Sequence, residues 1–531
     1  MRRNTMRIRR TAFAVTALSV TLVATGCTGE EGRSTNDEAG KAARAPQAGA
    51  PAGPNRRPPE EARLPGEAPS RYLSTFALDV DTASYGFARR ALTEGRRPDP
   101  STVRPEEFVN QFRQDYAEPS GDGFSVAADG GRLTGSPGEG AADGDIRLLR
   151  VGLQTRSASA GTRRDANLTF VIDTSGSMAE PGRLDLVKDA LHTLVDQLRP
   201  SDSVAIVAYE DRARLVREMT PATRKPELHR AIDSLSAGAS TNLEAGMVLG
   251  YQVARRGFRE GVTNRVILTS DGLANTGATV AAPILRRVSD EAAKGVSLLC
   301  VGVGSDYGDK LMEQLADNGD GRAVYVSERA KARDLFSREL PATVELRARD
   351  AKAQVGFDPQ RVESYRLIGF DDRGLRSEDF RNDAADGGEI GPGHAVTALF
   401  AVRLKPDAEG HLADITVRWA DPDTRKAQET GRTVTVEDLA PGLWSDGSPR
   451  LRVSAVAALF AEHLRDGDPG HAPQSPYVTP SAGPFVTRGL VPGEPRIGLD
   501  ELSGHVTELA SATEDRDVAE LRDLISRARG V

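Results

Sequence analysis

The chain has 531 residues, a formal net charge of −8 and an isoelectric point near 5.6. This length exceeds what one hydrophobic core usually serves, so two or three domains are expected. The acidic balance argues against nucleic acid as a partner, because phosphate binding requires concentrated positive charge. The two cysteines, Cys27 and Cys300, exclude a scaffold built on several disulfides.

The first 27 residues have the features of an export signal. Five arginines in MRRNTMRIRR precede the apolar run TAFAVTALSVTLVA, and ATGC ends at Cys27. Small residues before a cysteine resemble a bacterial lipobox, in which the cysteine is lipidated and becomes the new first residue. Ala24 stands where such boxes usually carry leucine, and an ordinary secretory signal is the alternative. We expect a lipid anchor that holds the protein on the extracytoplasmic side of the cell membrane.

The next segments prepare the first folded part of the chain. Residues 28–70 lack aromatic side chains and are rich in Ala, Pro, Gly and charge, which predicts a disordered tether. A strand is expected over 74–80, and helices over 81–95 and 103–116. A Gly-rich region then extends to about residue 145, and the apolar stretch 146–156 predicts a strand.

From about residue 167, short apolar runs alternate with helical patterns. Such an alternation is typical of a doubly wound parallel α/β sheet that is covered by helices on both faces. The expected strands are 168–173, 203–209, 265–271, 296–304 and 323–327, with 214–219 as a short edge strand. The expected helices are 184–198, one that starts near 243, 279–294, 309–317 and one from about 330 toward 346.

After about residue 347 strands predominate, and they predict an antiparallel β-sandwich-like domain with terminal helices. The strands are expected over 351–357, 363–370, 394–404, 412–419 and 431–436, and the helices over 451–467 and within 499–528. Because the strand 146–156 precedes the α/β domain and these strands follow it, we hypothesise that the α/β domain is inserted into the β-domain.

Oxygen-bearing side chains gather at one edge of the predicted sheet. In an open α/β sheet, ligands bind beyond the carboxyl ends of the strands. Asp173 ends the strand of FVIDTSGSM, Asp271 ends that of RVILTSD, and Thr241 of GASTN precedes a helix at the same edge. With Ser175 and Ser177, these loops supply two carboxylates and three hydroxyls. Such an all-oxygen set favours a hard cation of the Mg²⁺ type.

The segments DTSGS, GASTN and TSDG, in this order, resemble the metal-ion-dependent adhesion site (MIDAS) of von Willebrand factor type A (VWA) domains, which have a Rossmann-like fold. All five positions match the motif: Asp173, Ser175, Ser177, Thr241 and Asp271. The resemblance implies that the hydroxyls bind Mg²⁺, or Mn²⁺ or Ca²⁺, directly, with the aspartates often acting through water. It further implies that a protein ligand supplies an Asp or Glu carboxylate.

The likeness extends beyond the site. STFALDVDTASY, RVGLQ, and ESYRLIGF through GEIGPGHAVTALF look like a family of bacterial VWA lipoproteins with a characteristic N-terminal segment and a C-terminal domain of unknown function. The predicted division is a signal peptide over 1–27, a tether over 28–70, an N-terminal family segment over 71–160 that partly packs on the β-domain, a VWA domain over 161–346 and a β-rich domain over 347–531.

Other functions fit the sequence less well. The chain lacks the nucleophile-elbow frame of a serine hydrolase around its site serines and the Lys-Ser or Lys-Thr ending of a phosphate loop, and we expect no enzymatic activity. Three alternatives stay open: a site that binds no metal, a structural envelope protein that the metal only rigidifies, and a hydrolase that uses Asp79 and Asp81. These two aspartates also fit a strand end and a helix cap. Asp202 and Asp233 are expected to be surface groups.

Overall fold

The computed structural model describes residues 70–78, 82–133, 145–157, 164–238, 240–271, 278–304, 310–326, 335–336, 346–371, 373–383, 385, 387–422, 424–465 and 497–531. All of them belong to one compact unit, Leu64–Val531. Cys27, Asp79, Asp81, the tether and most of the helix expected after residue 330 lie outside the described residues. Within the described part, no helix has the length and apolarity needed to cross a membrane.

A six-stranded sheet forms the α/β domain, with strand order β6-β5-β4-β7-β8-β9. Its strands are parallel except β6, which pairs antiparallel with β5 at the edge. The inner strands β4 and β8 are buried at every position, as expected for a sheet covered on both faces. The bounds are β4 Ala166–Asp173, β5 Ser203–Tyr209, β6 Ala213–Pro221, β7 Thr263–Ser270, β8 Val296–Val303 and β9 Arg322–Val326.

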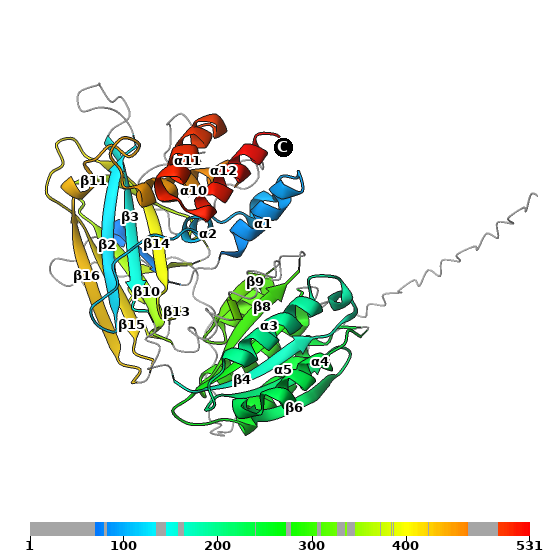
Figure 1. The fold of residues 1–531 in the computed structure, drawn as a ribbon. Coiled ribbons are helices and arrows are strands. Elements are labelled where there is room, and N and C mark those ends of the chain that lie inside the picture. The colour runs from blue at the N-terminus through cyan, green and yellow to red at the C-terminus, as the bar shows by residue number, and fades with distance from the viewer. Residues whose placement is uncertain are drawn as a thin grey trace, which may run out of the picture. The chain divides into compact units, whose positions relative to one another are not determined.

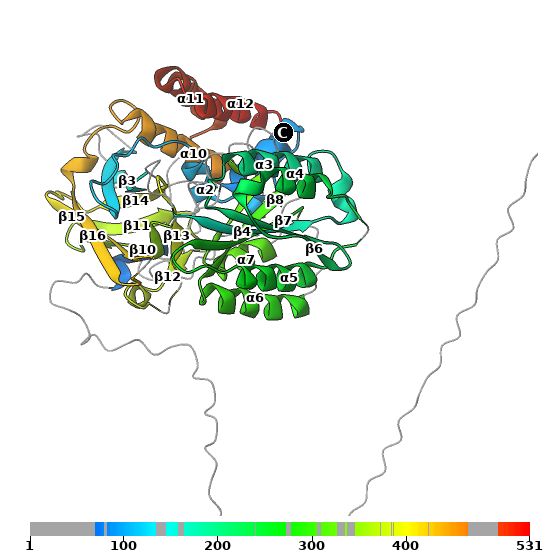
Figure 2. The same ribbon diagram turned by 60° about the horizontal axis from the view of Figure 1, so that its bottom comes forward.

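Helices cover both faces of this sheet, which confirms the predicted doubly wound α/β fold. Figure 2 shows α3 and α4 on one face and α5, α6 and α7 on the other, and a separate apolar core fills each side. The bounds are α3 Leu184–Gln197, α4 Lys225–Asp233, α5 Leu243–Arg256, α6 Ala278–Ala292 and α7 Lys310–Asp317. Of these, α4 was not predicted from the sequence.

Two antiparallel sheets form the flanking β-sandwich, which was also predicted (Figure 1). One sheet has the order β12-β1-β10-β15-β16, with β13 paired to β10, and the other has the order β11-β14-β3-β2. Their facing side chains, such as Phe76 and Val355 from the first and Leu149 and Phe400 from the second, share one core. The bounds are β1 Leu73–Ala77, β2 Phe124–Arg132, β3 Asp145–Thr155, β10 Ala348–Phe357, β11 Val362–Ile368, β12 Gly374–Leu375, β13 Gly388–Ile390, β14 Ala395–Leu404, β15 His411–Ala420 and β16 Ala427–Thr435.

The pairing of β3 bears on how the two domains are connected. β3 precedes the α/β domain in sequence and pairs along its length with β14, which follows that domain, from Asp145 opposite Leu404 to Gln154 opposite Ala395. The strands on either side of the α/β domain therefore lie in one sheet, as the insertion hypothesis requires.

Five helices pack together next to the sandwich and share a core that includes Tyr85, Phe108 and Phe460. They are α1 Ala83–Thr93, α2 Pro105–Asn110, α10 Pro449–Arg465, α11 Leu499–Thr513 and α12 Arg516–Ala528. The expected helix over 103–116 is shorter in the structure and ends at Asn110. Beyond this end, the side-chain amide of Gln114 donates to the carbonyls of Val109 and Phe112.

Two further expectations need correction. The Gly-rich region contains the strand β2, whose Gly130 allows close packing: a Cβ there would collide with the carbonyl oxygen of Leu148. Asp202 is not a surface group but is fully buried, where it accepts hydrogen bonds from the backbone N–H groups of Ala166 and Arg199, both at 2.8 Å. The carboxylate thus binds backbone N–H groups from two chain segments, and these hydrogen bonds compensate for its burial.

Candidate metal centre

Asp173 is placed by β4, the buried strand that ends at it. Its side chain is fully buried and accepts three hydrogen bonds: from Ser175 N and Ser270 Oγ at 2.8 Å, and from Tyr209 Oη at 3.2 Å. Each of these donors is neutral. Burial raises the pKa of Asp173, because the carboxylate has lost its hydration and its hydrogen-bond donors carry no positive charge.

The loop after Asp173 presents two hydroxyls on one side. Ser175 Oγ lies 3.2 Å from Ser177 Oγ, and the loop turns tightly because Met178 N donates to Ser175 O at 3.1 Å. Thr174 anchors the loop to the neighbouring strand, since its N–H and its hydroxyl both donate to the carbonyl of Tyr209 at 2.9 Å. Asp173 and the two serines are therefore brought together as one oxygen-rich group.

Asp271 directly follows β7 and is paired with Arg183, which precedes α3. Arg183 Nη1 donates to Asp271 Oδ2 at 2.6 Å and to Ser177 O at 3.3 Å, and both side chains are almost fully buried. Arg183 Nη2 also forms an ion pair with the exposed Glu180 at 2.8 Å. The guanidinium thus compensates the charge of Asp271 and links it to the serine loop.

Thr241 lies in the segment before α5 and is half-buried. This segment meets the serine loop at Gly238, whose N–H donates to Thr174 O at 2.6 Å, and a Cβ at Gly238 would collide with Glu210. The next residue, Asn242, caps α5 by accepting a hydrogen bond from Ala245 N at 3.0 Å. Thr241 therefore lies at the same edge of the sheet as the other predicted ligands. The described hydrogen bond to the serine loop comes from Gly238, in the same segment, and not from the Thr241 side chain.

These residues fit a hard divalent cation. Of the two buried carboxylates, Asp271 pairs with the Arg183 guanidinium, whereas Asp173 accepts hydrogen bonds from neutral donors, so a negative charge remains next to the two serine hydroxyls. Carboxylate and hydroxyl oxygens are the donors that Mg²⁺ and Ca²⁺ prefer. In the described part of the chain, no three His, Cys, Asp or Glu side chains gather to hold a metal, so a cation bound here would also need the hydroxyl oxygens.

Three residues of this centre were not predicted: Ser270, Tyr209 and Arg183. Ser270 could have been found, because it immediately precedes Asp271 in TSDG and β7 lies beside β4. Tyr209 is the last residue of β5 and lies opposite Asp173 in the strand register. Arg183 has no local signal, since its contact with Asp271 spans 88 residues of sequence.

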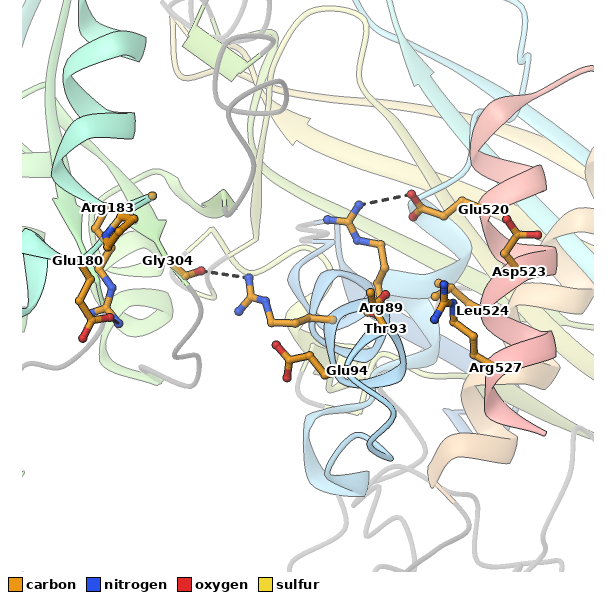
Figure 3. Close-up of a pocket in the computed structure, with 13 residues that line it drawn as sticks. Arg89, Thr93, Glu94, Glu180, Arg183, Gly304, Glu520, Asp523, Leu524 and Arg527 are labelled. Carbon is orange, nitrogen blue, oxygen red and sulfur yellow. Dashed lines mark hydrogen bonds and ion pairs between the residues drawn. The ribbon is translucent and has the colours of Figure 1, made fainter. Parts of the chain in front are cut away.

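A hollow of about 500 Å³ lies beside Arg183, which is one of its lining residues (Figure 3). Arg183 and Gly304 line it from the α/β domain, and Arg89 and Arg90 line it from α1. Arg90 Nη2 donates to Gly304 O at 3.1 Å, and Arg89 pairs with Glu520 of α12 at 3.4 Å. The guanidinium next to Asp271 therefore also borders a hollow that is lined mainly by charged side chains.

Known protein families match three parts of the chain. The von Willebrand factor type A domain family matches residues 167–338, the family described as "Uncharacterized protein YfbK, C-terminal" matches residues 342–410, and the family described as "von Willebrand factor" matches residues 64–133. The matched ranges follow one another along the folded part of the chain.

Individual proteins show the same relationship. "Uncharacterized protein YfbK" of Escherichia coli (strain K12) is 34% identical over 422 residues, which cover 75% of this chain and 72% of that protein. "Uncharacterized protein sll0103" of Synechocystis is 29% identical over 197 residues, covering 36% of this chain and 46% of that protein, so the chain spans less than half of this relative. A solved structure, "von Willebrand factor type A from Catenulispora acidiphila", has a TM-score of 0.42 at 14% identity and covers 66% of this chain and 82% of that chain.

The match to YfbK extends beyond the α/β domain, and the family matches lie on both sides of that domain as well as within it. The chain therefore belongs to the family of bacterial von Willebrand factor type A domain proteins that includes YfbK.

Proposed function

We propose that the chain is a lipid-anchored, extracytoplasmic protein that binds a protein partner through a divalent cation at a MIDAS. A VWA domain suggests a protein-interaction function of the adhesion type. The observation that carries the metal site is the group around Asp173: a fully buried carboxylate with neutral hydrogen-bond donors, beside two hydroxyls 3.2 Å apart.

The site residues have separate roles in this proposal. The residues that would hold the cation are Asp173, Ser175, Ser177, Thr241 and Asp271. When bound, Mg²⁺ (or Mn²⁺ or Ca²⁺) supplies an open coordination position for an Asp or Glu carboxylate of the partner. Ser270 and Tyr209 fix the orientation of the Asp173 carboxylate, and Arg183 fixes that of Asp271.

The proposed location rests on the N-terminal sequence. Cleavage before Cys27 and lipidation of its thiol would anchor the chain in the cell membrane, and residues 28–70 would extend the folded part away from the surface. Divalent cations are plentiful outside the cell, so a site with few direct carboxylates and modest affinity would still be filled.

Calorimetric titration of Mg²⁺ into the purified full-length chain in detergent tests the metal site. We expect saturable binding that is lost in Asp173→Asn, which keeps the side-chain shape and removes the charge. Asp211→Ala, at an exposed position after β5, is the matched control and should bind as the wild type does. Wild-type protein that binds none of Mg²⁺, Mn²⁺ and Ca²⁺, or an Asp173→Asn variant that binds normally, would refute the metal site.

A membrane extract passed over immobilised protein tests the adhesion function. Partners should be retained in Mg²⁺, released by a chelator and absent from the Asp173→Asn column. Retention that is identical with chelator would separate partner binding from the metal and refute the proposed mechanism.

A further inference from the structure

The helices α3 and α4 lie side by side on one face of the α/β sheet (Figure 2). Each carries the same pattern of a lysine, a histidine and an aspartate, spaced by four residues and therefore aligned on one helical face. The members are Lys188, His192 and Asp196 on α3, and Lys225, His229 and Asp233 on α4.

The two patterns contact each other with a twofold-like symmetry. His192 Nε2 lies 3.1 Å from Asp233 Oδ1, and His229 Nε2 lies 3.1 Å from Asp196 Oδ1. The two remaining ring nitrogens face one another, with 2.7 Å between His192 Nδ1 and His229 Nδ1. The four side chains thus form a continuous row: carboxylate, imidazole, imidazole, carboxylate.

The lysines repeat this symmetry. Lys188 Nζ donates to the carbonyl oxygen of Asp233 at 2.9 Å, and Lys225 Nζ donates to that of Asp196 at 2.5 Å. Their ammonium groups therefore bind backbone oxygens at the helix ends and leave the carboxylates of the aspartates to the imidazoles.

This row determines where the ring protons are. An ionised carboxylate only accepts hydrogen bonds, so Nε2 of each histidine must be the N–H donor. If both rings were neutral, two bare lone pairs would face each other across 2.7 Å; if both were fully protonated, two N–H groups would collide. One cation between the two Nδ1 atoms would satisfy both rings, and a single shared proton fits the 2.7 Å between them.

We propose that His192 and His229 form a second cation site, which exchanges this proton for a divalent metal ion that prefers imidazole, such as Zn²⁺. Each Nδ1 lone pair would bind the metal, waters would complete its coordination, and the one shared proton would leave to buffer. The site is independent of the MIDAS, whose oxygen donors select harder ions.

The outer carboxylates support this assignment. A metal-binding histidine usually donates its other ring N–H to a carboxylate, which fixes the tautomer and makes the free nitrogen a better ligand. Asp233 and Asp196 do this for His192 and His229. Both imidazoles are accessible to ions, because their side chains are 30% and 28% exposed.

The geometry requires a small adjustment. Two nitrogens bound to one tetrahedral Zn²⁺ lie about 3.3 Å apart, so the Nδ1 atoms must separate by roughly 0.6 Å and the rings must turn. Partly exposed side chains on neighbouring helices can make this movement without disturbing the core below them.

Titration of Zn²⁺ into the full-length chain, with excess Mg²⁺ present to fill oxygen-rich sites, tests the proposal. We expect saturable binding of one Zn²⁺ per chain and one released proton, measured by repeating the calorimetry in buffers of different ionisation enthalpy. His192→Gln and His229→Gln should each lose this binding. Asp233→Asn, which keeps both metal ligands, should weaken it by about 10- to 100-fold.

Two controls separate this site from other Zn²⁺ binding. His411→Gln removes a histidine that also contacts a carboxylate, Asp414 at 3.1 Å, but the two described contacts of its ring are with carboxylates and not with a second imidazole. It should bind Zn²⁺ as the wild type does, and so should Asp173→Asn. Equal Zn²⁺ affinity in wild type and in folded His192→Gln and Asp233→Asn, or binding without proton release, would overturn the proposal.

Discussion

Glu106 gives the fold a pH dependence whose sign and size follow from its surroundings. It lies in the first turn of α2 with 3% of its surface exposed, beside the equally buried Glu107. Burial, and next the charge of Glu107, raise the pKa of Glu106 from 4.5 to about 7. Glu107 has its own partners, Ser84 N at 2.7 Å and Arg104 at 3.3 Å, so it repels Glu106 without sharing a cation with it.

Because the pKa of Glu106 is higher in the folded than in the unfolded chain, the folded state holds the extra proton between these two values. The stabilisation is complete below the unfolded pKa of 4.5 and is lost as the pH rises through about 7. At roughly 1.4 kcal/mol for each pKa unit, the free energy of unfolding should fall by roughly 3 kcal/mol over this window.

Glu106→Gln tests this reasoning, because glutamine has the same shape and stays neutral. The free energies of unfolding of wild type and variant are measured in urea at about pH 5 and about pH 8. The difference, variant minus wild type, should be more positive by roughly 3 kcal/mol at the higher pH. The exposed Glu244→Gln on α5 is the matched control and should give no such trend. If the difference in free energy of unfolding between Glu106→Gln and wild type is the same at both pH values, Glu106 is ionised in the folded protein over this whole pH range, and the reasoning is refuted.

Two further predictions test local features of the fold. Arg183→Met removes the guanidinium beside buried Asp271, so the melting temperature without metal should fall, as expected for a cost of roughly 3–5 kcal/mol. Mg²⁺ should raise the melting temperature of the variant more than that of the wild type, because a competing positive charge is gone. A Mg²⁺-induced shift equal to that of the wild type would contradict this role of Arg183. Gly130→Ala forces a Cβ against the carbonyl of Leu148 and should lower the free energy of unfolding by about 1–3 kcal/mol in the same urea assay. Its control is Gly86→Ala in α1, where the Cβ meets nothing within 4 Å, and this variant should raise the free energy of unfolding by about 0.5–1 kcal/mol.

The elements that the sequence predicts well have a strong local pattern. β4 and β8 are continuous apolar runs, and α3 has its leucines at helical spacing, so each could be assigned without knowledge of its neighbours. Asp173, Ser175 and Ser177 are close in sequence and follow a strand, which is why their grouping could be foreseen.

The missed elements depend on contacts between distant segments. β2 contains Gly130 and Gly131, which usually indicate a loop, and only the packing of Leu148 and Leu443 against them explains their presence in a strand. The short α4 begins with Lys225 and Pro226 and has few apolar positions.

The histidine pair was missed for the same reason. His192 and His229 are 37 residues apart, and without α4 nothing in the sequence brings them together. Asp202 was assigned to the surface by its charge, although its two backbone donors come from residues three and 36 positions away. A buried charge of this kind can be recognised only when its partners are placed.

The two aspartates of the proposed MIDAS have different electrostatic environments, and this difference has a consequence for the partner. Asp271 already faces the guanidinium of Arg183, whereas Asp173 has neutral donors. The positive charge of a divalent ion would therefore be balanced mainly by Asp173, because the serine hydroxyls carry no charge. An ion with so little negative charge around it binds an anionic ligand more strongly than a neutral one. The same arrangement that leaves Asp173 without a cation thus favours a carboxylate, rather than an amide or hydroxyl, as the group that the partner presents.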